Sequence, residues 1–300
     1  MPSFRKPAAQ AKHIIKQKLG INTARHTHKE NKEPAQQKIH SLGTTRNYTQ
    51  ALTRITKWIQ ENRLGDLKNL NTETAIQYLE LRGQSVSQKM LNQERQAVQL
   101  HLGVKLPIIK SELSQTLKSR AYTEKQIEII SKAQTPKYQL ATQIAYTAGL
   151  RAHELLTLRL QTERSASKHR QWSSNRFIGK EGILYTVIGK GGLIREALIP
   201  KALAAQLENL RHSPIIIKDR NIHYQQHYNI GGGKDWSNSF SAACKRTLGW
   251  SHGAHGLRHS FAQQRMNELQ QRGYFYETAL GIVSQLLGHF RPDITEVYLR

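Results

Sequence analysis

Apolar residues in the first third of the chain recur every three or four positions, which is the period of amphipathic helices. Along TTRNYTQALTRITKWIQEN they form one stripe, made of Tyr48, Ala51, Leu52, Ile55, Trp58 and Ile59. A second helix is predicted in LNTETAIQYLELRG, with Thr72 as a candidate N-cap and Gly83 as a candidate stop, and a third in SVSQKMLNQERQAVQLHLG. These stripes predict a compact bundle of short helices over residues 44–104, with the apolar faces in its core.

The rest of the chain is also mainly helical, with one change of period. YTEKQIEII is predicted to open a helix with a capping box between Thr123 and Gln126. A second helix is predicted in YQLATQIAYTAG, and a third is predicted to begin near LRAHELLTLRL. GILYTVIGKGGLIREALIP instead consists of two β-rich runs joined by a glycine turn, which predicts a β-hairpin. Helices return in PKALAAQLENLR, WSNSFSAACKRTLG, HGLRHSFAQQRMNELQQRG and YETALGIVSQLLG. The predicted fold class is therefore mainly α with a small antiparallel β-sheet (α+β).

Composition divides the chain into four parts. Residues 1–43 are polar and rich in Lys, Arg, Gln and His, and are expected to form a basic N-terminal arm, mobile or partly helical. Residues 105–121 contain Pro107 and scattered lysines and are expected to be a linker. The linker separates the helical bundle, residues 44–104, from a larger domain, residues 122–300. A length of 300 residues suits two such domains.

The charge balance is strongly basic. The chain has 45 Lys and Arg residues against 21 Asp and Glu residues, a formal net charge of +24. Self-repulsion of this size favours a polyanionic partner, and nucleic acid is a better candidate than an anionic membrane surface. The single Cys244 excludes a disulfide framework, and no secretory signal or membrane-span pattern is present. A cytoplasmic, nucleoid-associated protein with no membrane partner is expected.

Four segments supply side chains suited to phosphodiester transfer. In chain order the candidates are Arg151, Glu154, Lys190, His255, Arg258, His289 and Tyr298. Forked arginine donors match the nonbridging oxygens of a reacting phosphate, a tyrosine can act as nucleophile, and a lysine on a hairpin turn can protonate a leaving oxygen. Each residue alone has an ordinary explanation, such as a helix-surface ion pair between Arg151 and Glu154. Their occurrence together favours the chemical one.

The stretch SHGAHGLRHS could instead bind zinc. His255 and His259 are four residues apart and would share one face of a helix. However, the motif lacks the glutamate of HExxH, and Arg258 would place a positive charge beside the cation. A phosphate is therefore favoured, with His259 bracing the segment through a hydrogen bond, and neither a metal nor another cofactor is expected.

The four segments that supply the candidate side chains, taken in their order along the chain, resemble the tyrosine recombinases, the phage-integrase family. The resemblance covers roughly residues 44–300 and is strongest in GLRAHELLTLR, GKGG, HGLRHSFA and LGHFRPDITEVYL. The ending DITEVYL is most similar to integrases of integrating conjugative elements. The resemblance implies a helical, SAM-like core-binding domain that binds DNA, followed by a tyrosine-recombinase catalytic domain.

The resemblance also implies a role for each candidate. Arg151 and Arg258 would bind the scissile phosphate with the help of His289, and Glu154 would support the site. His255 would accept or donate a proton.

For the remaining two candidates the implied roles concern the bonds that break and form. Lys190 would protonate the leaving 5′ oxygen, and Tyr298 would form a 3′-phosphotyrosyl link. The implied function is a site-specific recombinase or integrase that acts on double-stranded DNA attachment sites without metal or ATP, integrating or excising a mobile element. A homotetramer on DNA is expected, with a DNA-bending or directionality protein as a candidate accessory partner.

Three features depart from the family's pattern. QQRGYFYET lengthens the span between Arg258 and His289, and the extended loop before the hairpin leaves Lys180 as a competitor to Lys190. The sequence ends two residues after Tyr298, where many relatives have a helix that docks on a neighbouring subunit, so that contact is expected to be absent or made by another segment. Two alternatives stay open: a type IB topoisomerase-like enzyme, and a non-catalytic DNA-binding protein on the same fold.

Overall fold

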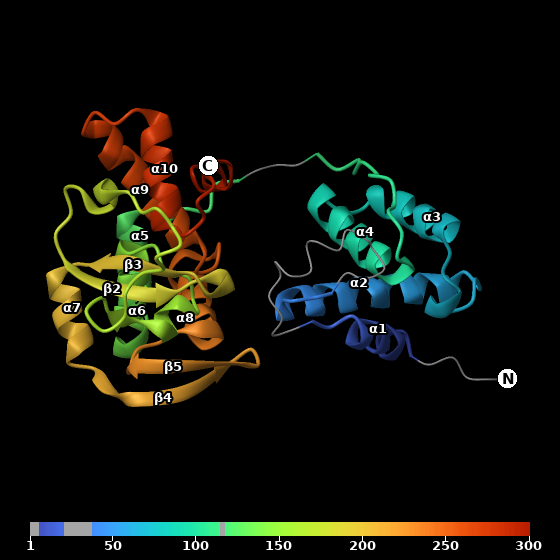
Figure 1. The fold of residues 1–300 in the computed structure, drawn as a ribbon, viewed down its shortest axis with the longest axis horizontal. Helices are drawn as coiled ribbons and strands as arrows, with labels where there is room; N and C mark the ends of the chain where they lie inside the picture. The colour runs from blue at the N-terminus through green and yellow to red at the C-terminus, as the bar shows by residue number, and fades with distance from the viewer. Residues whose placement is uncertain (1–5, 21–37, 115–117) are drawn as a thin grey trace. The chain divides into compact units, whose positions relative to one another are not determined.

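The computed structural model describes residues 6–20, 38–114 and 118–300, and the chain divides into two compact units (Figure 1). The units are Met1–Thr116 and Leu117–Arg300. Their boundary falls within the segment 105–121 that was expected to be a linker. Each unit has its own apolar core. None of the described helices is both long enough and apolar enough to cross a bilayer.

The N-terminal unit is a bundle of α-helices: α1 (Pro7–Gln17), α2 (Leu42–Glu61), α3 (Thr72–Gly83) and α4 (Gln88–Leu102). The predicted stripe of α2 is confirmed, because Leu52, Ile55 and Ile59 are buried in the core of this unit. The predicted cap of α3 is wrong by one residue. Asn71 is extended, and its side chain accepts the Thr74 N–H at 2.9 Å.

Part of the expected basic arm belongs to this bundle. Helix α1 packs on α2, with Ala11 and Ile15 buried in the same core as Ile39. Backbone hydrogen bonds between residues 18–20 and Ile39 hold the segment 38–40 beside the end of α1. The apolar stripe of α1 is only two turns long and is surrounded by lysines, so its pattern was too weak to predict a packed helix. Residues 1–5 and 21–37 lie outside the described residues.

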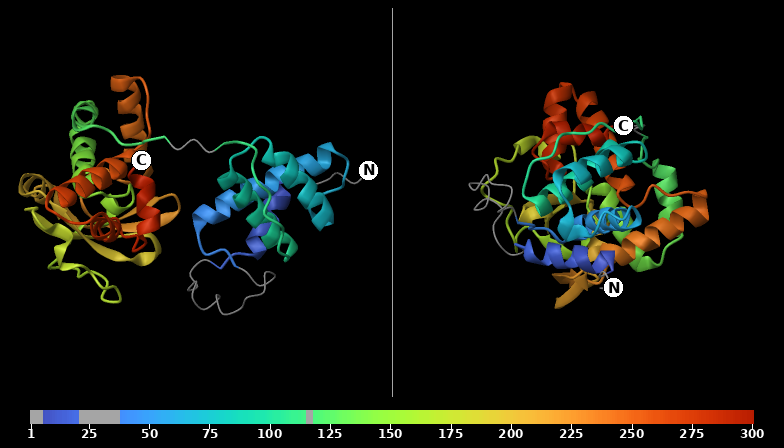
Figure 2. Two further views of the ribbon diagram at one scale, coloured as in Figure 1. Left: turned by 90° about the horizontal axis from the view of Figure 1, so that it is seen from above. Right: turned by 90° about the vertical axis from the view of Figure 1, so that its right-hand side faces the viewer.

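The C-terminal unit contains a three-stranded antiparallel sheet in the order β1-β2-β3. Helices of the same unit pack around this sheet (Figures 1 and 2). The strands are β1 (Arg159–Leu160), β2 (Ile183–Ile188) and β3 (Ile194–Ile199), so the predicted hairpin is confirmed. The helices are α5 (Glu124–Lys132), α6 (Pro136–Thr147), α7 (Lys201–Glu208), α8 (Gly233–Leu248), α9 (Gly256–Gln271), α10 (Tyr276–Leu286) and the short α11 (Pro292–Thr295). Thr123 and Gln126 form the predicted capping box at the start of α5.

One prediction about this unit was wrong. The segment LRAHELLTLRL does not begin a helix but forms a single 3-10 turn, Glu154–Thr157, followed by β1. This backbone is fixed by side chains instead: the Glu154 carboxylate accepts the Arg151 N–H, and Thr157 Oγ1 accepts the Ile188 N–H.

One feature of this unit was not predicted: a separate two-stranded ribbon, β4 (Arg211–Asp219) and β5 (Ile222–Tyr228). Its turn needs positive φ at Arg220 and Asn221, and arginine gives little sequence signal for such a turn. In Figure 1 the ribbon and the α9–α10 pair lie at opposite ends of the unit, with the three-stranded sheet between them.

Candidate functional site

A buried carboxylate gathers three arginines at the centre of the C-terminal unit. Glu154 is fully buried and accepts the Arg151 N–H at 2.8 Å and Arg151 Nη1 at 2.6 Å. Arg195 Nη2 donates to Glu154 Oε2 at 2.8 Å, and Arg258 Nη1 lies 3.7 Å from the same oxygen. Burial alone would raise the pKa of Glu154, but Arg195, Arg151 and Arg258 outweigh it and lower the pKa far below its ordinary value. Three positive charges facing one negative charge leave the cluster cationic.

Arg258 is fixed between the ends of two helices. Its Nη1 donates to the Gly149 carbonyl after α6, and its Nη2 donates to the Leu287 carbonyl after α10 at 2.9 Å. The same Nη2 lies 3.4 Å from His289 Nε2. Burial and the neighbouring Arg151 lower the pKa of Arg258 to about 9, so it still carries its charge at neutral pH.

Three histidines surround the ring of Tyr298. The ring centroid of Tyr298 lies 5.4 Å from that of His255, 4.7 Å from that of His259 and 5.1 Å from that of His289. The guanidinium of Arg258 lies 5.6 Å from the same centroid. Tyr298 is 8 % exposed and packs into the apolar core formed by α9 and α10. The segment that holds His255, about forty residues before Tyr298 in sequence, therefore meets the end of the chain around one phenol ring.

All three histidines are held neutral. Desolvation and the charge of Arg258 lower the pKa of His255 to about 4, although the residue as a whole is exposed. The same two causes lower the pKa of His289 to about 3. Desolvation and Arg120 lower the pKa of His259 to about 4. Neutral imidazoles can accept protons or hydrogen bonds.

The ring of His259 also contacts the backbone of Tyr298, the nucleophile candidate. A hydrogen bond links the His259 ring to the backbone of Tyr298, and Gln263 Nε2 donates to the Tyr298 carbonyl at 3.2 Å. Both donors lie on α9, the helix that begins directly after His255. The last turn of the chain is thus tied to the helix that carries Arg258.

Lys190 lies on the turn of the β2–β3 hairpin, beside the arginine cluster. Its side chain is exposed. A Cβ built on the preceding Gly189 would lie 3.3 Å from Glu154 Oε1 and 3.8 Å from Arg151 Nη1, so the base of the turn packs on the cluster. Lys180, the competing lysine, instead lies 2.5 Å from Glu268.

The arrangement suits a tetrahedral anion better than a cation. The Glu154 oxygens are occupied by arginines, and the histidines stand beside positive charges. Within residues 6–20, 38–114 and 118–300, no group of three or more His, Cys, Asp or Glu side chains could hold a metal ion.

Arg195 is the site residue that the sequence did not reveal. It lies on the same face of β3 as Ala197 and Ile199, and all three residues are buried. An arginine in the inward register of an otherwise apolar strand is unusual, and this was the one available signal.

The N-terminal unit has a hollow of its own, on α2 and α4. It has a volume of about 540 Å³ and is lined by Thr44, Asn47, Tyr48, Gln88, Lys89, Asn92, Gln93 and Gln96. Among the described residues of this lining, amides dominate, none carries a carboxylate, and Lys89 alone is charged. Asn47 Nδ2 donates to Gln93 Oε1 at 3.3 Å, which links the two helices across the hollow.

No family model and no curated protein sequence matches the chain. Among solved structures, the XerH site-specific recombinase bound to a palindromic difH substrate, in a post-cleavage complex, is similar with a TM-score of 0.58 at 15 % identity, over 99 % of this chain and 94 % of that one. A lambda integrase dimer bound to a COC' core site has a TM-score of 0.54 at 14 % identity, over 87 % and 89 %. The Tn1549 transposon integrase in complex with transposon right end DNA has a TM-score of 0.53 at 12 % identity, over 97 % and 94 %. The chain has the fold of the tyrosine recombinases, and the predicted fold class is confirmed.

Proposed function

We propose that the chain is a site-specific DNA recombinase of the tyrosine recombinase family, an integrase that integrates or excises a mobile element. One observation carries this proposal: on this fold, Arg258, His255 and His259 from the start of α9 and His289 from the segment after α10 surround Tyr298, beside a cationic cluster around Glu154. The excess of positive charge over the whole chain is suited to a DNA backbone.

In the proposed cleavage step, Tyr298 Oη attacks the scissile phosphorus and the bond from phosphorus to the 5′ oxygen breaks. Arg151 and Arg258 bind the nonbridging oxygens, whose negative charge grows in the transition state, and His289 assists them.

The two protons of this step move at opposite ends of the reacting phosphate. The tyrosine proton passes to neutral His255, and the Lys190 ammonium donates a proton to the departing 5′ oxygen. The product is a 3′-phosphotyrosyl ester and a free 5′ hydroxyl. Attack of a partner strand's 5′ hydroxyl on this ester reverses the same steps, so neither ATP nor a metal is required.

The two units have different roles in this proposal. Residues 44–104 bind DNA as the core-binding domain, and residues 122–300 carry the chemistry. Four chains act on two double-stranded attachment sites, with a DNA-bending or directionality protein as a candidate accessory partner. The protein acts in the cytoplasm, at the nucleoid.

The test is a nicked suicide duplex that carries the element's attachment site, with EDTA present. Cleavage traps a covalent protein–DNA adduct, which a denaturing gel resolves. We expect an adduct with the wild type and none with Tyr298→Phe, which should still bind the duplex.

Other results would support other functions. Tight binding without an adduct in either protein would support a non-catalytic DNA-binding protein. An adduct with relaxation of supercoils but no recombinant junction would support a topoisomerase, and activity that returns only with zinc would contradict the metal-free mechanism.

A further inference from the structure

Arg195 is a buried arginine for which the proposed chemistry has no use. Its side chain is 1 % exposed, and its Nη2 donates to the Gly149 carbonyl at 3.1 Å and to Glu154 Oε2 at 2.8 Å. Arg258 also donates to the Gly149 carbonyl and lies beside the same Glu154 oxygen. One guanidinium from the sheet and one from α9 therefore meet on a shared pair of acceptors.

The shared acceptors are themselves held in place. Gly149 has φ of 59°, and a Cβ at this position would lie 2.5 Å from the Phe261 ring. Only glycine leaves the chain free to turn here and present its carbonyl to both arginines. Glu154 is fixed by the two hydrogen bonds from Arg151.

Arg195 also lies at the base of the hairpin that carries Lys190. It pairs with Val187 across the β2–β3 ladder, and the Gly189 N–H donates to the Leu193 carbonyl at 2.7 Å to close the turn above it. A Cβ built on Gly191 or Gly192 would meet nothing within 4 Å. Among the described residues, none would hold a side chain at these two positions, so we take the strands below the turn to decide where Lys190 is placed.

We propose that Arg195 is a positioning residue that docks the Lys190 hairpin onto the phosphate-binding arginines. This inference rests on the proposed function. A lysine at position 195 could keep the charge, but its side chain ends one bond short of Nη2, so its ammonium could not reach the carbonyl and the carboxylate that Nη2 contacts together. Without these two bonds the hairpin loses the link that Arg195 makes to the cluster, and Lys190 is no longer held in line with the leaving oxygen.

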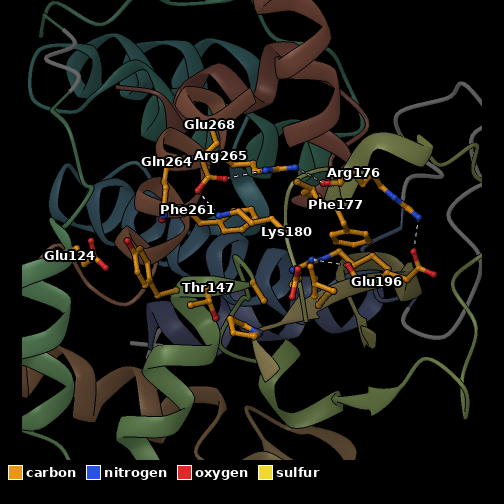
Figure 3. A pocket seen from close by; sticks show the side chains of 18 residues that line it. Glu124, Thr147, Arg176, Phe177, Lys180, Glu196, Phe261, Gln264, Arg265 and Glu268 are labelled. Carbon is orange, nitrogen blue, oxygen red and sulfur yellow. Dashed lines mark hydrogen bonds and ion pairs between the residues drawn. The ribbon is translucent and has the colours of Figure 1, made fainter. Parts of the chain in front are cut away.

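A cavity on the other side of Arg195 makes the substitution practical. The cavity has a volume of about 190 Å³, and Arg195 lines it together with Arg265 and Glu268 (Figure 3). The open space lets a lysine at position 195 settle without a clash.

Arg265 provides a matched control in the same cavity. Its side chain is 3 % exposed, and it forks onto Glu268 Oε2 at 3.0 Å and onto the carbonyls of Arg176 and Ile178 at 3.1 and 2.9 Å. Like Arg195 it is buried and bonds both a carboxylate and backbone carbonyls, but its partners lie outside the arginine cluster.

The experiment compares Arg195→Lys with Arg265→Lys in the full-length chain. Single-turnover cleavage is measured on two suicide duplexes, one with the ordinary scissile phosphate and one with sulfur in place of the bridging 5′ oxygen. The sulfur leaves as a thiolate and needs no proton, so this substrate does not depend on Lys190.

We expect Arg195→Lys to slow cleavage of the ordinary duplex about 10- to 100-fold, because small misplacements of reacting groups have effects of this size. On the sulfur duplex the same variant should cleave at nearly the wild-type rate. Lys190→Ala should show the same recovery, and Arg265→Lys should resemble the wild type on both substrates.

Each remaining outcome has a distinct meaning. Equal losses on both duplexes, or no loss on either, would overturn the role of Arg195. If the wild type forms the adduct but Lys190→Ala does not regain its cleavage rate on the sulfur duplex, Lys190 is not the acid. The inference about Arg195 is then also wrong. If the wild type forms no adduct, the proposed function itself fails. Duplex affinity and thermal unfolding of each variant separate these results from a folding defect.

Discussion

At the scale of single residues, Glu154 is the negative charge that lets three arginines share one buried cluster. Its folded-state pKa is far below the ordinary value of 4.5. A carboxylate with a lowered pKa stabilises the fold above its unfolded-state pKa, and this contribution is lost as the pH falls toward the folded-state pKa. We therefore expect Glu154→Gln to lower the free energy of unfolding at neutral pH by about 3 kcal/mol.

Urea unfolding of both proteins, from neutral to acidic pH, measures this contribution. The difference between the wild type and Glu154→Gln should shrink as the pH falls below about 4.5. A difference that stays constant with pH would mean that shape or hydrogen bonding, rather than charge, makes Glu154 important.

The histidines around Tyr298 respond to pH in a separate range. Desolvation and nearby arginines lower the pKa of His289 to about 3 from an ordinary 6.5. Between these values the unfolded chain binds a proton that the folded chain does not, so His289 makes the fold less stable as the pH falls through this range. A bound phosphodiester adds a negative charge and should raise the pKa again.

Proton NMR of the histidine ring signals in Tyr298→Phe checks this, without DNA and with an attachment-site duplex. The signal missing from a second variant, His289→Gln, assigns the resonance. We expect a strongly lowered pKa in the free protein and an upward shift with DNA. An ordinary pKa in the free protein would show that His289 is not in the dry, cationic surroundings described above.

The sequence predicted which residues are chemically important better than it predicted how they are held. Arg258, His255, His289 and Tyr298 were singled out from motif order, and the structure brings them together. Glu154 was weighed as part of a helix-surface ion pair, but it is buried. Burial and partner number depend on contacts between distant segments, and a single sequence does not encode these as a local pattern.

At the scale of elements, the amide-lined hollow between α2 and α4 has the chemistry of base recognition. Asn and Gln side chains pair with adenine edges in the major groove, whereas lysines grip phosphates. If residues 44–104 bind DNA as proposed, Asn92→Ala should weaken binding to the attachment site about 5- to 100-fold and leave binding to unrelated DNA unchanged. Lys89→Ala should weaken both.

Titrations of attachment-site and unrelated duplexes at fixed salt measure this difference. Gln77→Ala, an exposed amide on α3 outside the hollow, is the matched control. Equal losses on both duplexes for Asn92→Ala would show that the hollow carries no sequence information.

Elements with a strong period were predicted correctly, and elements fixed by side-chain contacts were not. The β2–β3 hairpin has a clear alternation and a glycine turn. The segment around Glu154 has helical spacing, but its backbone follows the buried carboxylate. In the β4–β5 ribbon, Ile215 and Ile216 are 49 % and 66 % exposed, and the buried residues of β5, 226–228, are consecutive, so the ribbon has no alternating pattern.

At the scale of the whole molecule, the net charge of +24 should dominate behaviour without DNA. Chains of like charge repel one another, and a duplex relieves this repulsion as lysines and arginines replace its counterions. We expect sedimentation to show monomers or weak oligomers in the free protein, and four chains per assembly only when two attachment sites are present.

Affinity for DNA should fall about 1,000-fold or more between 50 and 200 mM salt if at least six phosphates are contacted. A stable tetramer without DNA, or an affinity insensitive to salt, would mean that contacts between chains, rather than phosphate neutralisation, drive assembly.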